Sequence, residues 1–445
     1  MIWPALFALP NVIVIFCDDM GIGDVSCYGQ KAYRTPHIDR LAREGTRFTN
    51  FYVASPACSP SRAAILTGCY PVRVGVPQVL NPDSPTGLNP SETTLAETLK
   101  DRGYATACIG KWHLGVRNLL PRAHGFDEFY GVPYSHDMWP PNPNGTWPPL
   151  HLFRNENEEE PILTLQDTAQ LTSKLTAEAL KFMRRSAGKP YFLYLAHPLP
   201  HVPLASKRGS KQGLYADVIR DIDDSVGAVL QELKASGQDR NTLIIFSSDN
   251  GPWLPYGTHA GSAGIYREGK GTSFEGGFRV PGIFWWPGRV RPQVSDAVAS
   301  TMDVLPTVAA FSGAPQPKLK IDGHDLTSLL ARGGTSPWDE FFYWWPGELQ
   351  AVRVGDWKLH VPHSHRHQTQ PSGRNGKPAG EVTQRIGYTL YNLRTDPSEA
   401  NNVAAQHPEI VADLLGRIQT KRRELGDTLT GTKGRDARTP GRVNP

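Results

Sequence analysis

The sequence is poor in cysteine, with 5 among 445 residues. Cys17, Cys27, Cys58, Cys69 and Cys108 include no CxxC pair and no Cys/His spacing typical of a zinc site. So few and so scattered thiols argue against a fold held together by disulfides. Because their number is odd, at least one thiol stays unpaired in any intramolecular scheme.

Long apolar runs, repeats and strong charge are also absent. No stretch approaches the roughly 20 apolar residues that a membrane span requires. The net charge of +4 is small for this length, so nucleic acid is not an expected partner. The apolar start, residues 1–10, has no basic segment before it. It is either the end of a secretory signal peptide or a lead-in to the first strand.

The order of the apolar segments indicates an α/β fold. Short runs rich in β-branched residues predict buried parallel strands at 12–16, 105–109, 191–196, 243–246 and 283–286. Helical periodicity lies between them, at 38–44, 93–102, 171–185 and 215–236. Strands that alternate with helices predict a large sheet flanked by helices, over residues 1–340.

A second, smaller unit follows. Strand patterns at 351–361 and 388–393 and an amphipathic helix at 408–425 predict a small α+β domain over residues 341–425. Residues 426–445 are polar, basic and aperiodic, which predicts a disordered tail. Four histidines cluster between the two strands: His360, His363, His365 and His367. We interpret that segment as a solvated loop; a second metal site and the rim of a substrate pocket are the alternatives.

Four tryptophans are candidates for contacts with the ring of a substrate. Trp139, Trp147, Trp344 and Trp345 could stack on a sugar or aryl ring. Side chains of this kind more often cover a core.

Charged and ligating side chains follow four of the predicted strands. They are Asp18 and Asp19, then Lys111 and His113, then His197 and His201, and finally Asp249 and Asn250. In open α/β sheets, ligands bind beyond the carboxyl ends of the strands, so these groups should converge on one site. Asp18, Asp19, Asp249 and Asn250 offer oxygen donors only, which suit Ca²⁺ or Mg²⁺. We interpret His197 as a core residue rather than a ligand.

Cys58 lies in the run Cys58-Ser59-Pro60-Ser61-Arg62. Ser59 suits a helix N-cap and Pro60 the first helical position, so Cys58 should lie just before a helix. A helix N-terminus favours anions, and Arg62 can reach the same side. A single cysteine beside a helix is more often an ordinary buried thiol, so this motif alone does not identify a nucleophile.

Five motifs in order turn this pattern into a family resemblance. Residues 58–68 resemble the first signature of the sulfatases, and residues 103–113 resemble the second. Asp18-Asp19, the Ser-Asp-Asn-Gly run at 248–251 and the glycine-rich run at 269–277 are also similar. The resemblance covers nearly the whole chain. It implies an alkaline-phosphatase-like large mixed sheet, and residues 134–137 are most similar to arylsulfatases and N-acetylgalactosamine-6-sulfatases.

The resemblance also implies a role for each matching residue. Cys58 would be oxidised by a formylglycine-generating maturation enzyme, and the aldehyde hydrate would be the nucleophile. The four oxygen-donor residues would hold one divalent ion, usually Ca²⁺, with Mg²⁺ as the alternative. Arg62 would stabilise the hydrate, and His113 would take a proton from it. The remaining groups, which would bind the sulfate or the leaving oxygen, are Lys111, Ser135, His201 and Lys270.

The implied activity is hydrolysis of a sulfate monoester, of an aryl or carbohydrate alcohol. Two alternatives stay open: a phosphate or phosphonate ester hydrolase of the same superfamily, and a non-catalytic binder of sulfated glycans. Export from the cytoplasm would agree with the family and with the apolar start. The sequence does not indicate an oligomeric state.

Overall fold

The computed structural model describes residues 9–138 and 147–444. The signal-peptide question at residues 1–8 and the position of Trp139 lie outside this part of the chain.

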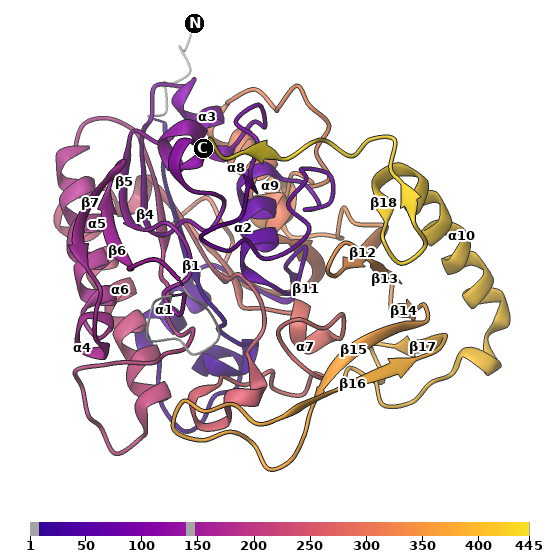
Figure 1. The fold of residues 1–445 in the computed structure, drawn as a ribbon. Coiled ribbons are helices and arrows are strands. Elements are labelled where there is room, and N and C mark those ends of the chain that lie inside the picture. The colour runs from indigo at the N-terminus through magenta and orange to yellow at the C-terminus, as the bar shows by residue number, and fades with distance from the viewer. Residues whose placement is uncertain (1–8, 139–146, 445) are drawn as a thin grey trace, which may run out of the picture.

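A ten-stranded mixed sheet forms the large domain (Figure 1), in the order β11-β2-β10-β9-β1-β8-β4-β5-β6-β7. β1 (Asn11–Cys17) lies parallel to both β9 (Thr242–Ser248) and β8 (Tyr191–Ala196). β4 (Ala105–Lys111) and β5 (Glu128–Val132) continue the parallel part, and β6 (His151–Arg154) and β7 (Asn157–Pro161) complete that edge antiparallel. On the other side lie β10 (Gly282–Trp285), β2 (Thr46–Tyr52) and β11 (Gln293–Ser300).

Helices cover both faces of this sheet because the strands are apolar on both sides. In β1, Val12, Val14 and Phe16 join one core cluster, whereas Ile13 and Ile15 join the other. The first face carries α2 (Cys58–Thr67), α3 (Leu95–Lys100) and α8 (Val304–Ser312). The second carries α1 (Pro36–Glu44), α5 (Leu171–Arg185) and α6 (Leu214–Ala235). The large domain also contains the short helices α4 (Leu165–Thr168), α7 (Glu275–Phe278) and α9 (Thr327–Arg332).

The predicted strands are present, with one error of direction. β10 was expected to be parallel but pairs antiparallel with both β9 and β2. A short apolar run indicates burial but does not show direction. β2 was not predicted, because polar residues separate Phe48 from Phe51 and Tyr52, which leaves neither an apolar run nor a regular alternation.

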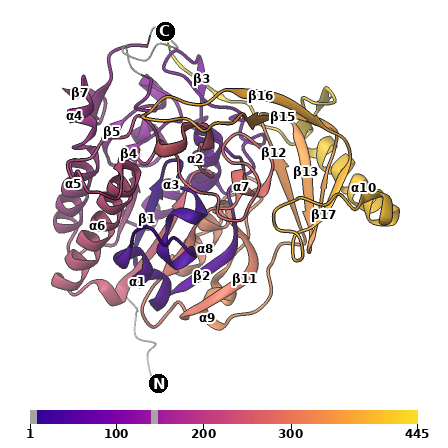
Figure 2. The ribbon, with the colours of Figure 1, turned by 90° about the horizontal axis from the view of Figure 1, so that it is seen from below.

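The small domain is an antiparallel sheet with one long helix (Figure 1). Its strands are β12 (Glu340–Trp344), β13 (Leu349–Val354), β14 (Trp357–His360) and β17 (Thr389–Asn392). α10 (Pro408–Leu425) packs against β13. A separate two-stranded ribbon, β15 (His363–Gln368) with β16 (Glu381–Ile386), extends from this domain towards the part of the large domain that carries α2 and α7 (Figure 2).

Two expectations for the C-terminal part were wrong. The histidines lie on β14 and β15 rather than in a solvated loop, and His360, His363 and His365 are buried. Residues 426–444 are not a disordered tail: β18 (Gly426–Asp427) pairs with β19 (Thr432–Lys433), and β20 (Gly441–Arg442) with β3 (Thr86–Gly87). Backbone pairing and ion pairs hold this segment in place. Such contacts leave no apolar pattern in the sequence, so the order could not be predicted.

No helix within residues 9–138 and 147–444 is both long and apolar enough to cross a bilayer.

Candidate active site

The two acidic strand ends meet, as the sheet topology requires. β1 and β9 are parallel neighbours with Cys17 opposite Ser248, so the residues that follow them emerge side by side. The backbone N–H of Asp19 donates to Oδ1 of Asp249 at 3.1 Å. Asp19 has a φ of 64°, a left-handed conformation that costs free energy in a residue other than glycine. The surrounding structure therefore holds this carboxylate in a fixed direction.

The donor set fits a hard divalent cation. Ligand atoms of Asp18, Asp19, Cys58 and His201 all lie within 4.8 Å of one another. Asn250 donates from Nδ2 to Oδ1 of Asp19 at 2.7 Å, and its own Oδ1 is buried with no hydrogen-bond partner among the described residues. A buried amide oxygen without a donor is unfavourable, and a cation would satisfy it. Carboxylate and amide oxygens are the ligands that Ca²⁺ and Mg²⁺ prefer.

Two buried lysines neutralise these carboxylates. Lys111 Nζ contacts Asp18 Oδ2 at 2.5 Å and donates to Ser135 Oγ at 2.9 Å. Lys270 Nζ lies 2.8 Å from Asp19 Oδ1. Burial alone would raise the pKa of Asp18, but electrostatic interactions with Lys111, His201 and Arg62 together hold that pKa well below its ordinary value. Asp18 is therefore an anion, ready to hold a cation.

Cys58 is the first residue of α2, one position inside the helix rather than before it. The N-cap is Ala57, not Ser59 as expected, and Ser59 Oγ instead accepts from the backbone N–H of Leu80 at 3.0 Å. Sγ of Cys58 lies 3.6 Å from Asp18 Oδ1. Burial raises the pKa of the Cys58 thiol to about 12, so the unmodified side chain is neutral at physiological pH.

Arg62 connects the helix to the carboxylates. It lies one turn after Cys58 and is fully buried. Its Nε and Nη2 donate to Asp249 Oδ2 at 3.0 and 2.8 Å, and Nη1 donates to the carbonyl of Lys111 at 2.9 Å. The guanidinium of Arg62 thus connects three of the sequence motifs: its own, the one that contains Lys111 and the one that contains Asp249.

The two predicted active-site histidines have assignable tautomers. His113 Nε2 lies 2.7 Å from the carbonyl of Leu80, so Nε2 carries the proton and Nδ1 is left as a buried acceptor with no partner among the described residues. Burial, followed by the charges of Lys111 and Arg62, lowers the pKa of His113 well below its usual value. His201 Nδ1 lies 2.5 Å from the carbonyl of Val202, and Nε2 faces Asp19 Oδ2 at 3.6 Å.

The structure thus brings together every residue that the sequence placed in the site, and it leaves His197 outside it. His197 Nε2 pairs with Ser225 Oγ at 3.1 Å in the core under α6, as expected for a structural histidine. Sequence reasoning missed Trp253, whose ring lies 5.5 Å from that of His201 and 4.6 Å from Lys270 Nζ. Its only signal was its position, four residues after Asp249.

A buried ionic cluster behind the site was also missed. Lys358 of β14 donates to the carbonyl of Ser273 at 2.8 Å and to Glu275 Oε1 at 2.9 Å, and it lies 2.9 Å from Glu399 Oε1. Glu399 in turn accepts from the backbone N–H of Glu275 at 2.7 Å. These contacts attach the loop that carries Lys270 to the small domain.

Comparison with known proteins agrees with this geometry. Residues 10–314 match the family model "Sulfatase", and residues 336–437 match "C-terminal region of aryl-sulfatase". The chain is 38% identical to arylsulfatase A of Homo sapiens, over 95% of this chain and 89% of that protein. It is 40% identical to N-acetylgalactosamine-6-sulfatase of Rattus norvegicus, over 79% of this chain and 71% of that protein.

Solved structures share the fold. The PsFucS1 sulfatase from Pseudoalteromonas sp. has a TM-score of 0.83 at 30% identity, covering 93% of this chain and 90% of that one. The phosphonate monoester hydrolase of Agrobacterium radiobacter has a TM-score of 0.63 at 20% identity, covering 98% of this chain and 100% of that one, a likeness of fold alone.

Fold and site together define an ester hydrolase of the alkaline-phosphatase-like architecture, with a centre lined by paired carboxylates and basic side chains. The chain belongs to the sulfatase family, and it is an enzyme that hydrolyses sulfate esters.

Proposed function

We propose that the enzyme works with one divalent ion, Ca²⁺ or else Mg²⁺, and with Cys58 converted to formylglycine by a maturation enzyme. The observation that carries this proposal is the placement of Cys58: it opens a helix and lies 3.6 Å from a carboxylate of the oxygen-donor cluster. A formylglycine hydrate at this position would supply one hydroxyl to attack sulfur and a second whose deprotonation releases sulfate.

The oxygen-donor residues Asp18, Asp19, Asp249 and Asn250 would hold the ion. A bound divalent cation polarises a sulfate oxygen and fixes the direction of the nucleophile. Lys111 and Lys270 would then turn from their carboxylate partners to the sulfate. The three basic groups already balance the three carboxylates, so a divalent ion makes the site positive, which suits an ester that gains negative charge.

Two histidines divide the proton transfers in this proposal. His113 is neutral and has its free lone pair on Nδ1, so it is suited to accept the proton of a hydroxyl at position 58. His201 presents Nε2 to the side where Asp19 and Lys270 lie, and it would contact the leaving oxygen. An alcohol leaves poorly without a proton, so His201 or Lys270 would act as the general acid. Ser135 fixes the direction of Lys111 through their 2.9 Å hydrogen bond.

Mass spectrometry of the peptide that contains residue 58 tests the covalent proposal. Protein produced together with a maturation enzyme should carry an aldehyde there and hydrolyse an aryl sulfate. A fully active protein with an unmodified thiol would overturn the proposal. A Cys27→Ala variant is a matched control, because Cys27 lies outside the site and its loss should leave both readouts unchanged.

Chelation tests the ion. Treatment with EDTA should abolish hydrolysis of an aryl sulfate, and added Ca²⁺ or Mg²⁺ should restore it; activity that is indifferent to EDTA would refute the metal site. Parallel assays with an aryl phosphate and an aryl phosphonate test the alternative that the enzyme prefers phosphate or phosphonate esters. A preference for either of these over the sulfate would contradict the proposal.

A further inference from the structure

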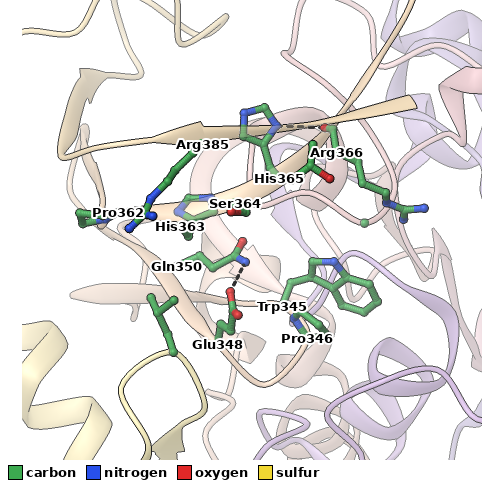
Figure 3. A pocket seen from close by; sticks show the side chains of 13 residues that line it. Trp345, Pro346, Glu348, Gln350, Pro362, His363, Ser364, His365, Arg366 and Arg385 are labelled. Carbon is green, nitrogen blue, oxygen red and sulfur yellow. Dashed lines mark hydrogen bonds between the residues drawn. The ribbon is translucent and has the colours of Figure 1, made fainter. Parts of the chain in front are cut away.

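A pocket of about 400 Å³ lies between the β15–β16 ribbon and the turn that joins β12 to β13 (Figure 3). This volume falls in the range of about 300–1,000 Å³ that is usual for small-ligand sites. Its floor includes Gly271, the residue after Lys270. The pocket is therefore bordered by the chain segment that carries the candidate sulfate-binding residue Lys270.

The alternating sequence of the ribbon gives the pocket a polar wall. Ser364 pairs with Arg385 across the ribbon, and Arg366 pairs with Thr383. Residues directly opposite one another, and residues two apart on one strand, share a face. All four line the pocket. The interleaved His363 and His365 also contribute to the lining, and His363 Nε2 lies 3.1 Å from Ser273 Oγ.

Positive charge predominates on this wall. A Cβ placed on Gly271 would lie 2.0 Å from Arg366 Nη2, so that guanidinium rests against the backbone beside Lys270. Arg366 has a long contact with Glu381 at 3.5 Å. Arg385 is exposed, and the ion pairs found in residues 9–138 and 147–444 do not include it. One acid, Glu348, lines the pocket.

The opposite wall offers a ring surface and polar groups. In Figure 3 the indole of Trp345, from the β12–β13 turn, and the guanidinium of Arg366, from the ribbon, lie towards the same end of the pocket. Gln350 donates from Nε2 to Glu348 Oε2 at 2.9 Å, and its Oε1 is buried with no partner among the described residues. An aromatic face with nearby amide and carboxylate groups suits a hydroxylated ring.

We propose that this pocket binds the part of the substrate beyond the scissile ester, and that this part is an acidic sugar with a second sulfate or a carboxylate. Trp345 would stack on the ring, Arg366 and Arg385 would pair with the second anion, and Glu348 would accept from ring hydroxyls. The inference rests on the proposed sulfatase site, and it assigns an anionic oligosaccharide rather than a simple aryl sulfate as the preferred substrate.

Direct binding tests the pocket without requiring turnover. The unmodified Cys58 protein is titrated calorimetrically with a chondroitin sulfate tetrasaccharide and with the desulfated, carboxyl-reduced tetrasaccharide. The anionic form should bind, and the neutral form should bind at least about tenfold more weakly. Arg385→Gln should weaken binding of the anionic form by about tenfold, which corresponds to one good ionic contact. Trp345→Ala should weaken binding of both forms.

Arg374→Gln is the matched control, because it removes the same charge from an exposed position of the same hairpin, outside the pocket. If Arg385→Gln and Arg374→Gln bind the tetrasaccharide equally, or if the wild type does not bind it, the inference is wrong. Hydrolysis of 4-nitrophenyl sulfate by the matured wild-type enzyme is measured separately. Its absence in the wild type would instead overturn the proposed active site.

Discussion

Replacement of Lys358 by methionine should destabilise the fold and loosen the Lys270 loop together. Lys358 is fully buried between two carboxylates, Glu275 and Glu399, and its ammonium also binds the carbonyl of Ser273. Methionine fills a similar volume but removes the charge and all three contacts. Among the described residues, Lys358 is the cation that pairs with Glu399; His360, 3.0 Å from the same carboxylate, is neutral because burial lowers its pKa well below the usual value.

The expected cost follows from the burial of both acids. Removing one member of a buried ion pair typically costs about 3–5 kcal/mol, because the other charge stays buried without compensation. Glu275 keeps Arg279 and the hydroxyls of Tyr52 and Tyr343, so the lower end applies. We expect a loss of about 3 kcal/mol in the free energy of unfolding. The KM for a sulfate ester should rise as well, because Ser273 and Glu275 fix the segment that follows Lys270.

Urea denaturation of the wild type and of Lys358→Met measures this difference. Lys320→Met is the matched control: Lys320 also pairs with a glutamate, Glu424 at 2.6 Å, but its side chain is 58% exposed. Loss of an exposed pair should cost only about 0–1 kcal/mol. If the two variants lose equal stability, or if Lys358→Met keeps the wild-type KM, then the cluster does not position the loop.

Two further predictions concern proton transfer and acid stability. His113→Asn should reduce kcat by about 10²- to 10⁴-fold, the usual contribution of a general base, with unchanged affinity for Ca²⁺ by calorimetry; a wild-type kcat would exclude His113 from proton transfer. Glu424 receives hydrogen bonds from Lys320, Lys421 and Arg73, which outweigh its burial and lower its pKa well below the ordinary 4.5. Its stabilising effect is therefore present above pH 4.5 and lost as the pH falls below it. Glu424→Gln should be less stable than the wild type at pH 7 and should lose less stability on acidification, measured by thermal unfolding from pH 7 to pH 3; equal slopes would contradict this.

The catalytic half of the fold was predictable because its strands are continuous apolar runs. The apolar run of β8 begins and ends where the strand does, and the residues just after it lie at the carboxyl end of the sheet. The site residues Asp18, Lys111 and Asp249 could be found for that reason. The order of the strands, and the reversed direction of β10, depend on long-range pairing that no local pattern records.

The small domain was less predictable because its order rests on polar contacts. In β15, histidines alternate with Ser364 and Arg366, so a half-buried strand has the composition of a loop. Arg438 is held by Glu92, with contacts of 2.7 Å across 346 sequence positions. Ion pairs between such distant residues give no periodic signal, which is why the sequence alone predicts a disordered tail after residue 425.

The burial of Cys58 would set a time limit on the modification that we propose for it. Only 2% of the residue is exposed, so another enzyme cannot reach the thiol in the finished fold. A segment from far along the chain packs next to it: Gly271 donates its N–H at 2.8 Å to the carbonyl of Pro56, two residues before Cys58. The ribosome needs roughly 10 to 40 s to make the roughly 200 residues between Cys58 and Gly271, at about 5–20 residues per second. During translation this contact is absent for at least that interval, so the closing of the active site would compete in rate with the proposed conversion of Cys58 to formylglycine.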